Sequence, residues 1–291
     1  MLKRLFRDRS DGKRIKAKDP FFRIIPYIMK ERSDAQVFFE ETIKLENVDT
    51  MIKSLRKEGH KVRFVHMVIA GIIRVISQKP KVNRFIAGKK AYSRNVIAIS
   101  IAIKKSMDVD SPETIIKLHF SPNDTLLDVV EKVNTAFEEN VEKMNQQNDT
   151  DKAANFFNML PGFLLNFSIG FIKFLDNHRM MPKFLIKLSP FHSSVFVVDL
   201  GSIGISSAYH HIYNFGTTSI FLAFGTKNKE LSKDTNNDVS TRKTMNFKYV
   251  VDERVVDGYY FASAIKLFRV IMHSPEQLLN PPESLGVDDE V

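Results

Sequence analysis

The segments with strand-like patterning come in clusters, and long helical segments separate the clusters. In the clearest strand, residues 95–103, isoleucines alternate with small side chains from position 97 onward, which predicts one bulky and one small face. Further strands are predicted at residues 37–45, 114–120, 193–199, 219–225 and 244–251. Clustered strands with segregated helices favour an α+β fold with a mixed β-sheet flanked by helices over regular βαβ winding.

Apolar residues at helical spacing predict four helices between and after these strands. They are a short helix at 48–57, a longer one that ends before Pro80, an amphipathic one over 126–141 and a final one over 257–272. The polar segment 226–242 is predicted to be an exposed loop.

Composition narrows the class of protein. A chain of 291 residues with 43% hydrophobic and 26% charged residues can bury a full core, which excludes wholesale disorder. The absence of cysteine excludes a disulfide scaffold, a thiolate metal site and a cysteine nucleophile. It fits a reducing compartment, so we expect a cytoplasmic protein.

The net charge of +9 lies mostly in an N-terminal arm. Residues 1–18 hold eight basic and two acidic side chains, and the rest of the chain is nearly balanced. We expect a solvated basic arm at 1–18, one domain over 19–282 and a mobile acidic tail at 283–291. Such an arm could contact anionic lipid or a neighbouring subunit. Nucleic acid is not expected as a partner, because no stacking aromatics alternate with the basic residues.

A hydrophobic insert spans about residues 153–190. Within it, residues 156–172 carry no charge, but polar residues, glycine and proline interrupt the run, and it barely reaches the length of a membrane span. A buried helix or a contact between subunits is therefore expected, and attachment to a membrane surface stays open.

Three motifs resemble one known family. Residues 251–258, Val-Asp-Glu-Arg-Val-Val-Asp-Gly, resemble the His-x-x-x-Asp-Gly signature of the 2-oxo acid dehydrogenase acyltransferase catalytic domain, which chloramphenicol acetyltransferase shares. Residues 196–204 are similar to the family strand that ends in Asn-Leu-Gly-x-x-Gly, and residues 80–83 resemble its Pro-x-Leu-Asn turn. The order of elements matches from about residue 35 to residue 280.

The resemblance implies a CoA-dependent acyltransferase fold assembled as a homotrimer, with the active site in a channel between subunits. Coenzyme A, as the acyl donor, would enter from one end and the acyl acceptor from the other, so the partner is a small-molecule thioester. In the family the histidine is the general base, a Ser or Thr on the facing strand holds the oxyanion, and the aspartate fixes the loop through an arginine.

Both chemical residues of the family are replaced here. Glu253 stands at the histidine position and Val198 at the Ser/Thr position, whereas Asp257 and Gly258 are retained. A glutamate carboxyl has an ordinary pKa near 4.3, against about 6.5 for histidine, so it is a weak base for a thiol unless burial raises its pKa. Losing one oxyanion donor costs about 10²–10³ in rate. Acyl transfer is therefore expected to be weakened or lost, as in a pseudoenzyme.

Alternatives remain open. His210 and His211 would serve as a relocated base, or Glu253 would act as the base after all. A metal site there is not expected, because adjacent residues on a strand point to opposite faces. The other function considered is a non-catalytic trimeric scaffold that engages a membrane surface or an acidic partner, so whether the protein is an enzyme stays undecided.

Overall fold

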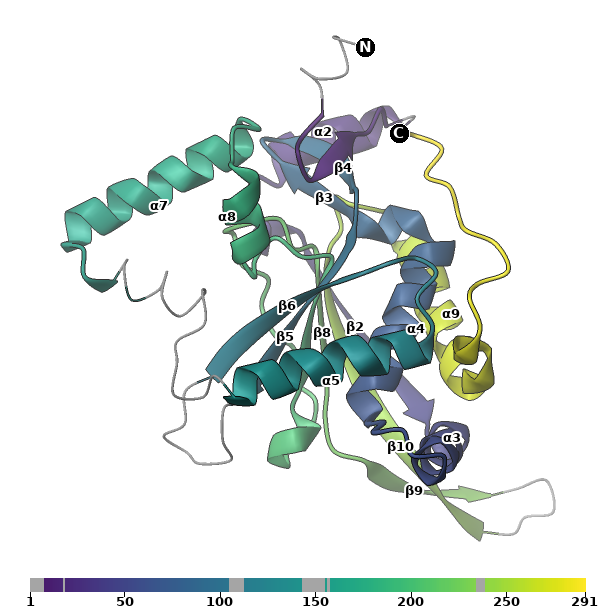
Figure 1. Cartoon of the computed structure of the whole chain (residues 1–291). Coiled ribbons are helices and arrows are strands. Elements are labelled where there is room, and N and C mark those ends of the chain that lie inside the picture. Colours follow the sequence, from purple (N-terminus) through teal and green to yellow (C-terminus); the bar gives the residue numbers. More distant parts are fainter. Residues whose placement is uncertain (1–7, 18, 105–112, 143–154, 156–157, 234–238) are drawn as a thin grey trace.

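The computed structural model describes residues 8–17, 19–104, 113–142, 155, 158–233 and 239–291 (Figure 1). Its main element is a mixed sheet with the strand order β2–β10–β8–β7–β5–β6. The strands are β2 (Gln36–Lys44), β10 (Val239–Asp252), β8 (Ile220–Phe224), β7 (Val195–Asp199), β5 (Ile97–Lys104) and β6 (Glu113–Phe120). β7 runs parallel to β5 and β8, and the other pairs in this order are antiparallel, so the predicted mixed sheet is confirmed.

Helices cover one face of this sheet (Figure 1). They are α3 (Glu46–Lys57), α4 (Phe64–Gln78), α5 (Leu126–Glu142) and α9 (Gly258–His273), close to the predicted bounds. Ile97, Ile99 and Ile101 of β5 join the core beneath them, whereas Ala102 of the same strand packs on the opposite face. Below, the face without this helical layer is called the open face. The alternation in the sequence thus predicted which side of β5 faces the helical layer, although the other side is also buried at Ala98 and Ser100.

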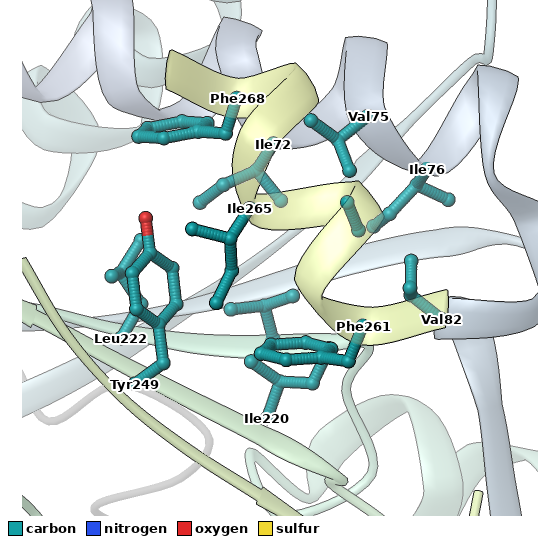
Figure 2. Close-up of a pocket in the computed structure, with 12 residues that line it drawn as sticks. Ile72, Val75, Ile76, Val82, Ile220, Leu222, Tyr249, Phe261, Ile265 and Phe268 are labelled. Atoms are coloured by element: carbon teal, nitrogen blue, oxygen red, sulfur yellow. The ribbon is translucent and has the colours of Figure 1, made fainter. Parts of the chain in front are cut away.

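A small apolar void lies within the core. It measures about 40 Å³, is lined only by apolar atoms and lies between α4, α9 and the sheet (Figure 2). Apart from Val82, the lining side chains labelled in Figure 2 all come from α4, α9 and the sheet. Its volume is far below that of a ligand pocket, so it is a packing defect.

A second, three-stranded sheet contains part of the N-terminal arm. Its order is β1 (Gly12–Arg14), β4 (Lys90–Arg94) and β3 (Arg84–Ala87), and α2 (Pro20–Ile28) follows β1 in the chain. Arg9 and Asp11 are buried beside β1. The expectation of a solvated arm is therefore wrong for residues 8–17, because the arm supplies a strand and a buried ion pair; residues 1–7 and 18 lie outside the described part.

Two further expectations are corrected. Within the predicted loop 226–242, β9 (Asn228–Lys233) pairs with the first half of β10, and residues 234–238 lie outside the described part. The tail 283–291 lies against the domain: Asp288 pairs with Arg84, and the backbone N–H of Gly286 donates to the Ser77 carbonyl at 2.7 Å. Its acidic side chains have basic partners on the domain, which is why it docks.

The described part of the hydrophobic insert contains α7 (Gly162–Asn177) and α8 (Lys183–Leu188). Figure 1 shows α7 extending from the domain, with α8 beside its C-terminal end. The expectation of a buried helix is wrong within this chain, since most of the apolar side chains of α7 are exposed. Among the described helices, none combines the length and the apolar character needed to cross a membrane.

Short 3₁₀ turns complete the chain: Ser33–Ala35, Pro80–Asn83, Gly201–Ile203 and Pro275–Leu279.

Candidate functional site

The turn after β10 is fixed by a buried ion pair. Asp252 is fully buried, and its two carboxylate oxygens accept from Nε and Nη2 of Arg254 at 2.8 and 2.7 Å. Nε of Arg32 lies 3.5 Å from the same carboxylate. Arg254 also donates to the carbonyls of Met29 and Lys30, just after α2. Such bidentate, charge-assisted pairing locks the turn geometrically.

Glu253 and Asp257 occupy this turn but take different roles. Glu253 is half-buried, and its backbone N–H donates to the carbonyl of Ala35 at 3.0 Å. Asp257 is exposed and caps α9 by accepting from the backbone N–H of Tyr260 at 2.8 Å. The resemblance implied that this aspartate holds the loop through an arginine; here the arginine partner belongs to Asp252.

Val198 lies on the open face of the sheet. It packs against Phe196, Phe221 and Ile212. Val198 pairs with Ala223, and Ala223 pairs in turn with Lys248 on β10. Val198 therefore lies two strand spacings away from Lys248, and Glu253 lies five residues beyond Lys248 along the chain. Together these offsets separate Glu253 from Val198 by more than about 15 Å. One chain does not bring Glu253 and Val198 together.

His210 and His211 also lie on the open face, in an irregular segment. The ring of His210 stacks on Phe221, with centroids 4.9 Å apart, and its Nδ1 lies 3.0 Å from the carbonyl of His211. The two imidazoles are neighbours, 4.8 Å apart, because the segment is not a strand. The argument that they point to opposite faces is therefore wrong. Within the described ranges, no three His, Asp or Glu side chains gather as a metal site would require.

The structure thus forms two groups of the predicted residues. Val198 and His210 both contact the Phe221 cluster on the open face. Glu253 and Asp257 lie beyond the end of β10, beside Arg254.

A basic cavity of about 470 Å³ adjoins the turn that carries Glu253. Six basic and two acidic side chains line it: Lys30, Arg32, Lys89, Lys90, Lys173 and Arg254, with Glu31 and Asp176. Partial burial, together with Arg14 and Arg179 nearby, lowers the pKa of Lys90. The excess of cations makes the cavity suited to a ligand with several negative charges.

A tight hairpin places two of these lysines. Gly88 and Lys89 both have positive φ, 54° and 61°, as a two-residue type I′ turn between β3 and β4 requires. A Cβ at position 88 would lie 2.1 Å from the Asn177 carbonyl, so glycine permits the end of α7 to approach. The turn therefore sets Lys89 and Lys90 beside the C-terminal end of α7.

A buried polar cluster lies next to the cavity and shares Asp176 with it. Nη2 of Arg9 lies 2.6 Å from the Asp176 carboxylate, and Nε of Arg9 lies 2.8 Å from Asp11. Nε2 of His192 lies 3.3 Å from Asp176, and Arg94 donates to the Thr217 carbonyl. Burial works to raise the pKa of Asp176, but the hydrogen bond with His192 and the charge of Arg9 hold it well below its ordinary value.

Sequence reasoning missed this cluster and the cavity. Arg9 reads as one cation of a basic arm, and Asp176 reads as the polar end of an apolar run. The available signal was an aspartate at the end of an otherwise apolar helix, since such a group needs a partner when it is buried.

The family model of the 2-oxoacid dehydrogenases acyltransferase (catalytic domain) matches residues 187–280 of this chain. That range includes Val198, His210, His211 and the whole turn from Asp252 to Gly258. No curated protein matches the chain in sequence.

Solved structures show the same fold over nearly the whole chain. A probable dihydrolipoamide acetyltransferase from Listeria monocytogenes is 13% identical, with a TM-score of 0.58, and the match covers 89% of this chain and 95% of that one. The cubic core of a pyruvate dehydrogenase multienzyme complex matches at 13% identity and a TM-score of 0.58 over 91% and 93%. The 2-oxoacid dehydrogenase core from Thermoplasma acidophilum matches at 14% and 0.55 over 90% and 99%.

These findings confirm the resemblance and the fold class. The protein has the fold of the acyltransferase cores of 2-oxoacid dehydrogenase complexes, and its C-terminal third carries that family's sequence pattern.

Proposed function

We propose that this protein binds a coenzyme A thioester, or a similar phosphate-bearing thioester, and that its acyl transfer to an acceptor is weakened or lost. The observation that carries the proposal is the basic cavity beside the turn of the family signature, in a chain that has replaced both chemical residues of that signature.

The cavity has the charge that a phosphate-bearing ligand needs. Lys30, Lys89 and Lys90 form no ion pair within the described part of the chain. Arg254 links the cavity to the turn, because its side chain lines the cavity and also pairs with Asp252 in the turn. A ligand held by these lysines would lie beside the turn that carries Glu253, the position at which the family has its general base.

The weakened chemistry follows from two side chains. Acyl transfer needs a base for the incoming thiol or hydroxyl and a donor for the developing oxyanion. A carboxylate at position 253 is a poorer base for a thiol than imidazole, and the side chain of Val198 donates no hydrogen bond. The loss of the base and the loss of the oxyanion donor each lower the rate of acyl transfer. The retained fold is therefore expected to bind the thioester but to transfer its acyl group slowly.

The assembly we propose is a homotrimer in the cytoplasm. Glu253 and Val198 are too far apart in one chain to act on one substrate, so a site that uses both positions needs a neighbouring subunit. The solved relatives include a cubic core, which supports a symmetric assembly. The cysteine-free composition fits a reducing compartment.

Calorimetry with coenzyme A and acetyl-CoA tests the binding proposal. We expect measurable affinity for the wild type and at least about tenfold weaker binding for Lys30→Gln/Lys90→Gln, because each charge-assisted contact contributes about 1.5 kcal/mol or more. The matched control is Lys53→Gln/Lys57→Gln, which removes two exposed lysines from α3 and should bind like the wild type. No binding by the folded wild type would favour the non-catalytic scaffold, and equal affinity of all variants would remove the cavity from the proposal.

Restoring the family residues tests the chemical part. The variant Glu253→His/Val198→Ser is expected to transfer acetyl groups from acetyl-CoA to a small dithiol at least about 10²-fold faster than the wild type. If the wild type already turns over at enzyme-like rates and Glu253→Gln abolishes them, Glu253 is a working base and the proposed loss is wrong. If the restored variant is no faster, the site does not use these two positions.

A further inference from the structure

Helix α7 presents a stripe of phenylalanines to the solvent. Phe163, Phe167, Phe171 and Phe174 recur at intervals of four and three residues, so they share one face, and they are 73%, 72%, 51% and 49% exposed. The rings of Phe167 and Phe171 stack 6.2 Å apart. Exposed apolar stripes of this size mark an interaction surface in a stable protein.

The C-terminal end of α7 is attached to the domain. Leu165, Ile172 and Leu175 are half-buried, and Asp176 is buried in its ion pair with Arg9. The first charge within the helix is Lys173, near its end. The helix is therefore held by its C-terminal end while its phenylalanine face stays open.

Helix α2 adds a second apolar surface at the same end of the molecule (Figure 1). Phe21, Ile24, Tyr27 and Ile28 are each more than half exposed. Lys173 of α7 lies 3.5 Å from Glu31, which follows α2, so the C-terminal ends of the two helices are in contact.

Basic side chains surround both helices. A shallow cavity of about 740 Å³ along α2 is lined by Arg14, Lys16, Arg23, Lys89 and Lys90. Lys183, Phe184 and Lys187 are exposed on α8. Nζ of Lys89 lies 5.1 Å from the ring centre of Tyr27, which places a cation directly above an exposed aromatic ring.

We propose that α7 and α2 dock this end of the protein onto an anionic lipid surface. The phenylalanines would enter the boundary between headgroups and acyl chains, and the lysines and arginines would lie among the phosphates. A second copy of this chain fits the surface less well, because a symmetric contact would bring the same cations together. The mode is attachment to the surface, since no described helix is suited to crossing a membrane.

Vesicle co-sedimentation of the full chain tests the proposal. The probes are phosphatidylcholine vesicles with and without phosphatidylglycerol, at low and high salt. We expect the wild type to sediment with the anionic vesicles, to do so far less with phosphatidylcholine alone, and to be released partly by salt. Phe167→Ser/Phe171→Ser should weaken binding at least about tenfold, because each inserted ring contributes more than a factor of ten when fully buried.

The matched control is Leu231→Ser, which removes an exposed apolar side chain from β9, away from this end. It should bind vesicles like the wild type, and thermal unfolding should show that all variants remain folded. Equal vesicle binding by Phe167→Ser/Phe171→Ser, or no binding by the folded wild type, overturns the proposal. Sedimentation that shows an oligomer dissociated by the same double substitution, without vesicle binding, assigns the stripe to a second copy instead. None of these readouts depends on coenzyme A, so the thioester proposal stands or fails separately.

Discussion

At the residue scale, Asp252 fixes the turn at residues 252–258 through its ion pair with Arg254, while its neighbour Glu253 stands where the family signature has histidine. The carboxylate of Asp252 is fully buried and faces two guanidinium groups, those of Arg254 and Arg32. Within the described part of the chain the side chain of Glu253 has no such partner, and its hydrogen bond to the Ala35 carbonyl is made by the backbone N–H. Structural and chemical roles are therefore separated between two adjacent residues.

Asp252→Asn should destabilise the protein by about 3–5 kcal/mol, because it leaves two buried arginines without their counter-charge. Glu253→Gln should change the free energy of unfolding by less than about 0.5 kcal/mol. Urea denaturation followed by circular dichroism measures both. Equal destabilisation by the two substitutions would show that the turn depends on Glu253 as well.

At the element scale, buried polar groups decide how helices begin and where segments attach. Nδ1 of His66 accepts from the backbone N–H of Arg63 at 3.0 Å and so caps the start of α4. Lys117 on β6 donates to the carbonyls of Ile186 and Ser189 and thereby ties the end of α8 to the sheet. Burial lowers the pKa of Lys117 to about 7.

The capping histidine makes stability depend on pH. Burial, with Arg63 and Arg56 nearby, lowers the pKa of His66 from 6.5 to about 4. Below pH 6.5 the imidazole of His66 is protonated in the unfolded chain but stays neutral in the folded protein. The free energy of unfolding therefore falls by about 3 kcal/mol between pH 6.5 and pH 4. Well above pH 6.5 the imidazole is neutral in both states and contributes no slope.

The control for this prediction is His66→Gln, since glutamine at this position of a helix accepts the same capping bond without titrating. Urea denaturation across this range should show the variant gaining stability relative to the wild type as the pH falls. Other acidic groups cancel in the difference, so a difference that is independent of pH would contradict the role given to His66.

At the scale of the whole molecule, the open face of the sheet is the surface where, in the proposed homotrimer, a neighbouring subunit would complete the site. Phe38 is exposed there and meets Tyr209 edge to face, with ring centres 5.3 Å apart. Nζ of Lys248 lies over the ring of Tyr209, 4.6 Å from its centre. Val198 and His210 lie on the same face.

Sedimentation velocity should show a species of three times the 33.4 kDa of one chain. Phe38→Asp should shift it toward the monomer, because a charge then has to be buried at the contact. Val270→Asp, an exposed position on α9, is the matched control and should leave the assembly intact. A wild type that stays monomeric at high concentration would contradict the proposed homotrimer.

The sequence by itself determined the elements whose patterning is local. Alternation in β5 and helical spacing in α4, α5 and α9 predicted these elements and the fold class. These predictions succeed because side-chain periodicity depends only on neighbours along one element.

Only the tertiary structure decided what distant charges do. Arg9 reaches Asp176 across 167 residues, and the tail at Asp288 docks on Arg84, so segments that are polar in sequence become part of the fold. The basic cavity is likewise assembled from α2, the β3–β4 turn, the end of α7 and Arg254. The reason is that an ion pair has no periodicity along the chain, and its partners are chosen by packing between elements that no local pattern describes.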